Sequence, residues 1–142
     1  EADGIWAVDE YSQATPRLMM ASSDGGLFLA DISRSFNGSP MTSYVERTGF
    51  DFGEPESIKL CKVVRPRIDA AAGTVIRIYV GAQTDLDGSI TWSAPMNFTV
   101  GTDLKVDCFV SGRYLAVKFE SVAQGPWRLK TFDLDIDGIG AY

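Results

Sequence analysis

The stretch "GRYLAVKFESVAQGPWRLKTFDLDIDGIGAY" (residues 112–142) decides the fold, because it contains two runs in which apolar and polar residues alternate. In the first run Leu115, Val117 and Phe119 are spaced two residues apart. Successive side chains of a β-strand point to opposite faces, so this spacing places three apolar side chains on one face. The first run therefore predicts a strand with one face in a hydrophobic core.

The second run changes phase part of the way along. Trp127 and Leu129 share one phase of the alternation, whereas Phe132 and Leu134 share the other. A β-bulge inserts one extra residue into a strand and so restores the apolar side chains to the same face. We therefore predict one long strand with a bulge near Lys130–Thr131.

The second run ends in "DLDIDG", in which Asp133, Asp135 and Asp137 match the first positions of an EF-hand calcium loop. An EF-hand loop lies between two helices, and no helical periodicity flanks this stretch. In a strand, carboxylates at every second position lie in a row on one face and cannot surround a single ion. We therefore expect no metal site, and a strand whose Asp face lies in water.

The rest of the chain after residue 57 consists of short apolar runs bounded by Gly, Pro or Asp, which is typical of a β-sandwich or barrel. We predict an all-β fold for residues 54–142. It should be an antiparallel β-sandwich of jelly-roll-like or immunoglobulin-like type. The side chains expected in its core are Ile76, Ile78, Val80, Val106, Val110, Leu115, Val117, Phe119, Phe132, Leu134 and Ile136.

Two local signals bear on the strand connections. Residues 104–110 alternate in the same way, beginning at Leu104, and Ser111–Gly112 follows as a tight-turn signal. We therefore expect residues 104–110 and 112–121 to form an antiparallel hairpin. Pro66 has no backbone N–H to donate, so it predicts a strand edge or a bulge at that point.

The N-terminal part predicts a β-hairpin segment over residues 1–53. It contains two apolar runs on either side of Ser23–Gly26, whose Asp-Gly-Gly sequence favours a turn. The segment would either derive from a β-propeller or pack on the sandwich. The break at Gly53–Pro55 marks the boundary between residues 1–53 and residues 54–142.

Composition excludes several classes of partner. The chain has 142 residues, no His and a formal net charge of −6. Nucleic-acid binding depends on Lys and Arg that neutralise phosphates, so an acidic chain is a poor partner for it. The sequence also has no basic cluster for an anionic membrane, no apolar run long enough to span one and no signal-peptide pattern. We expect a soluble protein that binds neither nucleic acid nor membrane.

The sequence predicts no catalytic chemistry. Without His, a Ser-His-Asp triad is excluded and so is the commonest metal ligand. No P-loop, dinucleotide fingerprint or nucleophile elbow occurs. Glu46, Glu54, Glu56 and Glu120 could supply a carboxylate pair for glycoside hydrolysis, but none of them lies in a recognisable motif. We therefore expect a non-enzymatic protein with no catalytic residues and no cofactor.

The two cysteines, Cys61 and Cys108, each lie inside an apolar run. This placement favours two buried thiols, because free Cys behaves as a small apolar side chain. A disulfide between them is the alternative, although no spacing pattern supports it.

The stretch "TDLDGSITWS" (residues 84–93) resembles the Asp-box hairpin of sialidases and related propellers at Asp87, Thr91 and Trp92. Asp boxes are folding elements that lie away from the catalytic centre, so the resemblance implies a turn anchored by the Trp. Flat aromatic rings also stack on sugars, and the chain is rich in Trp and Tyr. A glycan site at Trp92, Tyr79 and Asp87 is therefore the alternative.

Three stretches together resemble the C-terminal regions of bacteriophage virion proteins. They are "TGFDFG" (residues 48–53), "GRYLAVKFES" (residues 112–121) and "WRLKTFDLDIDG" (residues 127–138). The class comprises tail and head–tail junction proteins of short-tailed phages, often described as stabilisation or tail-nozzle proteins. The resemblance extends over residues 42–142.

The resemblance implies a structural building block of the virion, present as a ring of identical copies. Its partners would be other virion proteins and copies of itself. The resemblance implies no site residues. Our first hypothesis is accordingly a non-enzymatic virion module that acts through protein–protein contacts. The alternative hypothesis is a carbohydrate-binding β-sandwich module that recognises a surface glycan.

Overall fold

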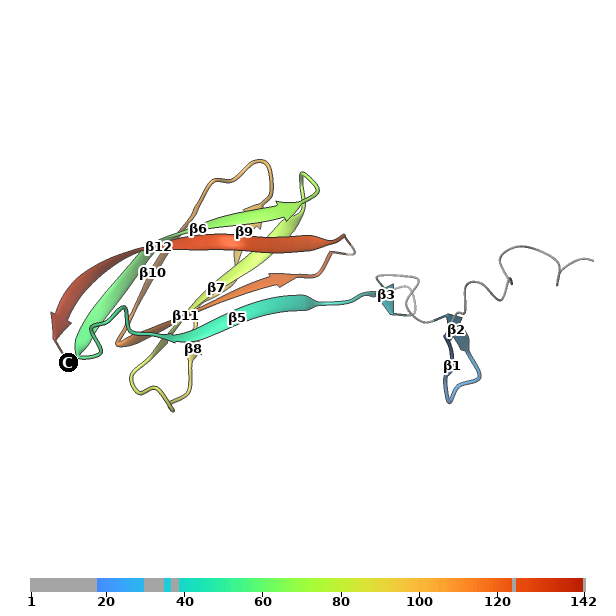
Figure 1. The fold of residues 1–142 in the computed structure, drawn as a ribbon, viewed down its shortest axis with the longest axis horizontal. Coiled ribbons are helices and arrows are strands. Elements are labelled where there is room, and N and C mark those ends of the chain that lie inside the picture. Colours follow the sequence, from blue (N-terminus) through green and yellow to red (C-terminus); the bar gives the residue numbers. More distant parts are fainter. Residues whose placement is uncertain (1–17, 30–34, 37–38, 124, 142) are drawn as a thin grey trace, which may run out of the picture. The chain divides into compact units, whose positions relative to one another are not determined.

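The fold is all-β, as the sequence predicts (Figure 1). In the part of the chain that the structure describes, every regular element is a strand. The chain divides into two compact units, residues 1–39 and residues 40–142, which are described separately. The computed structural model describes residues 18–29, 35–36, 39–123 and 125–141.

The first unit contains the predicted hairpin. Strand β1 (Met19–Ala21) pairs antiparallel with strand β2 (Leu27–Leu29). Gly25 lies in the turn with a φ of +87°, a conformation that Gly adopts without the steric cost of a Cβ atom. Two further short strands, β3 (Ser35–Phe36) and β4 (Ser39–Pro40), pair with each other.

The second unit is an antiparallel β-sandwich, which confirms the predicted fold class (Figure 1). One sheet has three strands in the order β10-β6-β12. The other has the order β5-β11-β7, with β8 and β9 pairing with opposite halves of β7. The strands are β5 (Ser43–Phe50), β6 (Ser57–Ala70), β7 (Val75–Gln83), β8 (Thr91–Trp92), β9 (Met96–Thr99), β10 (Val106–Gly112), β11 (Tyr114–Ser121) and β12 (Trp127–Ala141).

The core between the sheets forms from the alternating positions that the sequence indicates. Most of the predicted core side chains are buried, and the others pack against the core while partly exposed. The buried ones are Ile76, Ile78, Val80, Val106, Leu115, Val117 and Phe119. The partly exposed ones are Val110, Phe132, Leu134 and Ile136. Burying such a side chain fully contributes about 1.5–3 kcal/mol before entropy, and six of the seven buried predicted side chains lie on β7 and β11.

The predicted hairpin of residues 104–110 and 112–121 is wrong. β10 pairs with β6 in the three-stranded sheet, whereas β11 pairs with β5 and β7 in the other sheet. The chain therefore crosses between sheets at Arg113. Both strands face the same core from opposite sides, which gives both of them the alternation that a hairpin would also show. Leu104 precedes β10 and is 87% exposed.

Two predictions about strand irregularities are confirmed. The pairing of β12 with β6 shifts register between Leu129 and Thr131, which is the predicted bulge. Pro66 lies in the middle strand of the three-stranded sheet, but β10 pairs only with the part of β6 that ends at Val64. Pro66 itself lies opposite Phe132 of β12, and among the described residues no strand pairs with the other side of β6 at this point, so it lies at the predicted edge.

The boundary between the two units lies earlier than the sequence indicates. We predicted it at residues 53 and 54, whereas the structure divides the chain between Ser39 and Pro40. β5 belongs to the sandwich because it pairs with β11 from Ser43 to Phe50. The part of the predicted segment that includes residues 1–17 lies outside the described residues.

Candidate functional site

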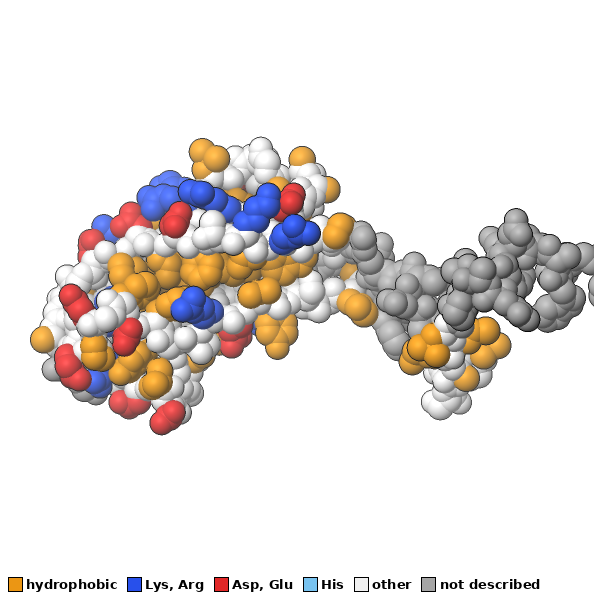
Figure 2. Space-filling view, in the orientation of Figure 1, with side chains coloured by type: hydrophobic (Ala, Val, Ile, Leu, Met, Phe, Trp, Pro, Cys, Tyr) orange, Lys and Arg blue, Asp and Glu red, His pale blue; other side chains and the backbone are white. Residues whose placement is uncertain are grey.

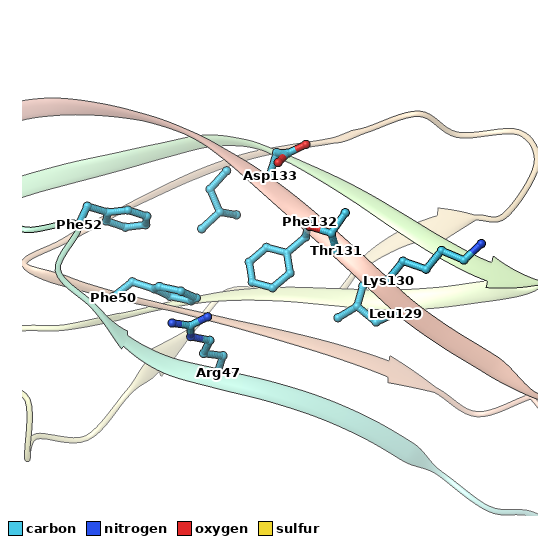
Figure 3. A pocket seen from close by; sticks show the side chains of 9 residues that line it. Arg47, Phe50, Phe52, Leu129, Lys130, Thr131, Phe132 and Asp133 are labelled. Carbon is cyan, nitrogen blue, oxygen red and sulfur yellow. The ribbon is translucent and has the colours of Figure 1, made fainter.

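A groove with both apolar and polar lining runs along one side of the sandwich, between the edge strands β5 and β12 (Figure 3). We call it the β5–β12 groove, and its volume is about 500 Å³. Figure 2 shows hydrophobic side chains gathered along this side of the sandwich. The lining residues are Arg47, Phe50, Phe52, Leu129, Lys130, Thr131, Phe132, Asp133 and Leu134.

The groove exists because one sheet does not cover the other at β5. In the pairing of β5 with β11, Val45 lies opposite Phe119 and Arg47 lies opposite Val117. Residues directly opposite each other share a face of the sheet, and both β11 partners are buried in the core. Val45 and Arg47 therefore face the interior, yet Val45 is 48% exposed. β12 reaches β5 at its two ends, where Trp127 Nε1 donates a hydrogen bond to Ser43 Oγ at 2.8 Å and Phe132 meets Phe50, while Val45 between them stays half-exposed.

Three aromatic rings form the floor of the groove. The rings of Phe50 and Phe52 stack with centroids 5.5 Å apart. Phe132 meets Phe50 edge-on, with ring centroids 6.1 Å apart (Figure 3). The centroid of the Phe132 ring also lies 5.3 Å from that of Phe119 in the core. Such pairs contribute about 0.5–1.5 kcal/mol each beyond their buried area, so the floor is a fixed surface rather than a set of loose side chains.

Local backbone geometry holds Phe52 in this stack. Phe52 has a φ of +55°, in the left-handed region that non-glycine residues rarely adopt. The side chain of Asp51 accepts a hydrogen bond from the N–H of Gly53 at 3.1 Å, which tightens the turn around Phe52. A strained backbone costs about 1–3 kcal/mol and persists only where its surroundings hold it in place.

One charge lies over the apolar floor. The guanidinium of Arg47 lies 4.7 Å from the centroid of the Phe50 ring, in a cation–π contact (Figure 3). No carboxylate of the described residues forms an ion pair with Arg47. Lys130, by contrast, pairs with Asp69 at 3.4 Å. The groove therefore combines an apolar floor with one cation that lacks a carboxylate partner.

The stretches that carry the phage resemblance meet at this groove. Residues 48–53 supply Phe50 and Phe52, and residues 127–138 supply the lining from β12. The remaining stretch, residues 112–121, is β11, whose Phe119 contacts Phe132. The sequence could not indicate this meeting, because the segments come together only through the pairing of β5 with β11 and the packing of the sheets.

A second groove lies on the opposite seam of the sandwich, between β7–β8 and β10. We call it the β8–β10 groove, and its volume is about 530 Å³. Polar side chains dominate its lining, together with Trp92 and the 79% exposed Phe109. The polar lining residues are Gln83, Thr84, Ser89, Thr91, Ser93 and Ser111.

Gln83 braces the loop that borders the β8–β10 groove. Its side-chain amide donates hydrogen bonds to the carbonyl oxygens of Gly88 at 2.7 Å and Leu86 at 3.4 Å. Its amide oxygen is buried without a hydrogen-bond partner among the described residues. A buried polar atom without a partner is costly, so the two donated bonds must compensate for it. Sequence reasoning missed Gln83, because nothing local distinguishes it from an exposed Gln.

Only one of the three residues of the predicted glycan site lines the β8–β10 groove. Trp92 lines the β8–β10 groove, and its ring packs over Gly81, where an added Cβ would lie 2.9 Å from the ring. Asp87 is exposed in the loop before β8, and Tyr79 donates a hydrogen bond to Glu120 at 3.3 Å. Neither Asp87 nor Tyr79 lines the groove. Trp92 is the anchor that the Asp-box resemblance implies.

The Asp residues of "DLDIDG" form a ladder of ion pairs on the outer face of β6 and β12. Asp137 pairs with Lys62 at 2.8 Å, and Asp135 pairs with Arg65 at 3.4 Å. Asp133 lies 3.9 Å from Arg67. The hydrogen bond from Lys62 to Asp137 raises the pKa of Lys62. β12 is therefore a strand with its Asp face in water, as predicted, and each carboxylate already has a cation beside it.

Among the carboxylates considered for glycoside hydrolysis, Glu46 and Glu120 lie on the paired strands β5 and β11, and Glu54 and Glu56 lie in the segment between β5 and β6. Glu120 lies 3.6 Å from Arg77 and 3.4 Å from Lys118. Glu56 pairs with Arg113 at 2.7 Å. In the described ranges no three His, Cys, Asp or Glu side chains form a group that could hold a metal ion.

The two cysteines are neighbours in the core. Cys61 and Cys108 are free thiols, both buried, with their sulfur atoms 3.4 Å apart. The bulge in β10 between Asp107 and Val110 brings Cys108 beside Cys61. The hydrogen bond between the thiols, followed by burial, raises the pKa of Cys61, and the same bond lowers the pKa of Cys108. The sequence prediction of two buried thiols is confirmed.

Lys59 closes the end of the sandwich where the chain changes sheets. Its side chain is almost fully buried and donates hydrogen bonds to three backbone carbonyls. The acceptors are the oxygens of Glu54 at 2.5 Å, Ser57 at 2.9 Å and Arg113 at 2.9 Å. A buried ammonium is tolerated only when its donors are satisfied, so Lys59 has a structural role.

The chain matches no protein-family model, and no curated protein is significantly similar to it in sequence. No helix within the described ranges is long and apolar enough to cross a membrane.

Proposed function

We propose that this chain is a non-enzymatic structural module that acts through protein–protein contacts. The β5–β12 groove carries this proposal. It exposes packed aromatic rings beside two strand edges, and exposed apolar surface of this kind marks interaction sites. The side chains around the groove are held by ring packing and strand pairing, so the surface is already formed before a partner binds.

We also propose that the module belongs to a phage particle, at the tail or the head–tail junction. The resemblance of residues 48–53, 112–121 and 127–138 to virion proteins supports this assignment. In a virion the partners would be other structural proteins and further copies of this chain. Copies arranged head to tail around a closed rotation form a ring.

Light scattering after size exclusion, over a range of protein concentrations, tests the self-assembling form of this proposal. We expect a discrete species of several copies whose abundance rises with concentration. The variant Phe52→Ser should reduce that species, because Phe52 is exposed at the groove and lies in the aromatic stack. A single monomer at every concentration would overturn self-assembly and favour the second candidate function.

The second candidate is a carbohydrate-binding module that recognises a surface glycan. The β8–β10 groove supports it, because Trp92 and Phe109 provide flat apolar faces beside hydroxyl and amide groups. Sugars bind where a ring stacks on an aromatic face and polar groups take their hydroxyls.

A glycan array probed with the labelled chain tests the second candidate. We expect specific binding that Trp92→Ala abolishes. The variant Leu104→Ala is the control, since Leu104 is exposed and does not line the groove. An array without any bound glycan would remove the candidate.

A further inference from the structure

The β5–β12 groove is bordered by two strand edges that have no partner among the described residues. β12 pairs only with β6, and β5 pairs only with β11. The outer edge of each strand therefore presents backbone N–H and C=O groups to which another strand can pair. This arrangement, an apolar floor between two open edges, is what an added strand requires.

The sheets differ in strand number at this side of the sandwich. The three-stranded sheet ends at β12, while the facing sheet continues to β5. The inward-facing Val45 shows the consequence, because nearly half of its surface remains exposed. One further strand beside β12 would cover Val45 and extend the smaller sheet.

β12 of a second copy fits this position poorly when the two strands pair about the middle of the Asp stretch. The outer face of β12 carries Asp133, Asp135 and Asp137 at alternate positions. In an antiparallel pair of two identical strands, outward-facing residues lie opposite outward-facing residues. Registers that pair residues 133–137 with themselves place Asp opposite Asp, and like charges directly opposite are destabilising, whereas registers that pair this stretch with residues 127–131 avoid that repulsion.

Arg47 indicates the chemistry of the partner. Its guanidinium lies at the inner face of β5, over Phe50, without a carboxylate partner in the described part of the chain. An inward-facing charge on an edge strand discourages pairing with purely apolar strands. The same charge favours a strand that carries a carboxylate at the matching position, which gives the groove selectivity.

We propose that the β5–β12 groove binds an extended segment of another protein, which adds a strand at the free edge of β12. The segment has apolar side chains at alternate positions, which cover Val45 and Phe132, and it carries a carboxylate opposite Arg47. This proposal rests on the proposed function of the chain as a protein–protein contact module, and it names the kind of partner.

Selection from a random library of short peptides, displayed against the immobilised full chain, tests the proposal. Peptides of about nine residues span roughly 30 Å of extended strand. We expect the selected peptides to share alternating apolar residues and one Asp or Glu. Hydrogen exchange measured with a selected peptide should slow at backbone amides of β12 between Leu129 and Leu134, which gain hydrogen-bond partners.

Variants of β5 locate the binding site. Arg47→Glu should weaken binding of a selected peptide by about five- to tenfold, because it replaces attraction by repulsion. A peptide with Lys in place of its carboxylate should bind Arg47→Glu better than it binds the natural chain. The matched control is Glu46→Ala, since Glu46 is adjacent in sequence but belongs to the opposite face of β5.

Three results would overturn the proposal. The first is a library that yields no binding peptide. The second is a selected peptide that binds the Arg47→Glu variant as tightly as the natural chain. The third is a selected peptide whose binding is lost in the Trp92→Ala variant instead. These results are independent of the assembly measurement. If the chain assembles with itself but selects no strand-like peptide, the proposed function stands and the proposed partner is wrong.

Discussion

The two open seams of the sandwich are nearly equal in size and differ in lining. The β5–β12 groove has a volume of about 500 Å³ and an aromatic floor. The β8–β10 groove has a volume of about 530 Å³ and a largely polar lining. In the second groove, Gln83 binds the neighbouring loop to the sheet, whereas no described segment covers the first. Strand arrangement creates both grooves, and side chains decide what each can bind.

The largest expected effect contrasts the aromatic side chains of the two grooves. Phe132→Ala should lower the free energy of unfolding by about 3 kcal/mol, because Phe132 packs on Phe50 and on the buried Phe119. Phe109→Ala in the β8–β10 groove should change it by no more than about 0.5 kcal/mol, since Phe109 is 79% exposed. Urea unfolding followed by fluorescence measures both. Equal effects would mean that the two grooves are not distinguished by packing.

The next effect concerns the brace of the polar groove. Gln83→Met should lower the free energy of unfolding by about 1 kcal/mol, since it removes the hydrogen bonds to Gly88 and Leu86. Part of the loss is offset because the unpartnered amide oxygen is removed as well. The control is Thr84→Ala, an exposed neighbour in the same groove. If Gln83→Met were as stable as the natural chain, the cost of burying the unpartnered oxygen would be at least as large as the gain from the two hydrogen bonds.

A smaller effect tests whether the apolar groove is open in solution. Val45→Ala should cost about 0.5 kcal/mol, whereas Val117→Ala on the partner strand should cost about 2 kcal/mol. Both side chains face the interior, but Val45 is 48% exposed and Val117 is 1% exposed. Thermal unfolding at high dilution provides the comparison. Equal costs would mean that another segment or another copy covers Val45.

The smallest effect concerns the outer face of β12 and its dependence on pH. The pKa of Lys62 is raised in the folded state by its hydrogen bond to Asp137. The Lys62 contribution to stability is therefore complete below the unfolded-state pKa of about 10.5 and is lost as pH rises through the folded value. The Tm difference between the natural chain and Lys62→Met should be constant at neutral pH and shrink in alkali. An unchanged difference in alkali would contradict the assignment.

The alternation of apolar and polar residues correctly predicts the features that depend only on neighbouring residues, namely strands and bulges. The strand of Leu115, Val117 and Phe119 and the bulge between Leu129 and Thr131 follow from a period of two, which neighbouring residues impose on each other. The prediction of a β10–β11 hairpin is wrong because the Gly of its turn signal, Ser111–Gly112, is required for another reason. A Cβ atom at position 112 would lie 2.7 Å from the Cβ of Ala82, so this position favours glycine. Its role is close packing between sheets rather than a tight turn.

The candidate sites depended on contacts that alternation does not encode. The aromatic residues of "TGFDFG" were recognised as a motif, but their contact with Phe132 requires the packing of two sheets. The inward direction of Arg47 follows from its pairing opposite Val117, which only the β5–β11 register defines. Trp92 was identified as a turn anchor, whereas the brace by Gln83 depends on a loop conformation that the sequence did not reveal.

The pairing of β12 with β6 has a consequence for the order of events during synthesis. The pairing of β6 with β12 runs from Ser57 opposite Ala141 to Ala70 opposite Trp127. The ribosome therefore makes β6 long before it makes the strand that pairs with it. Until β12 has emerged from the ribosome, the inner face of the three-stranded sheet lacks Phe132, Leu134 and Ile136. Closing such long loops is slow, and exposed strand edges invite wrong pairing. The sandwich must therefore complete its fold after most of its chain has been made.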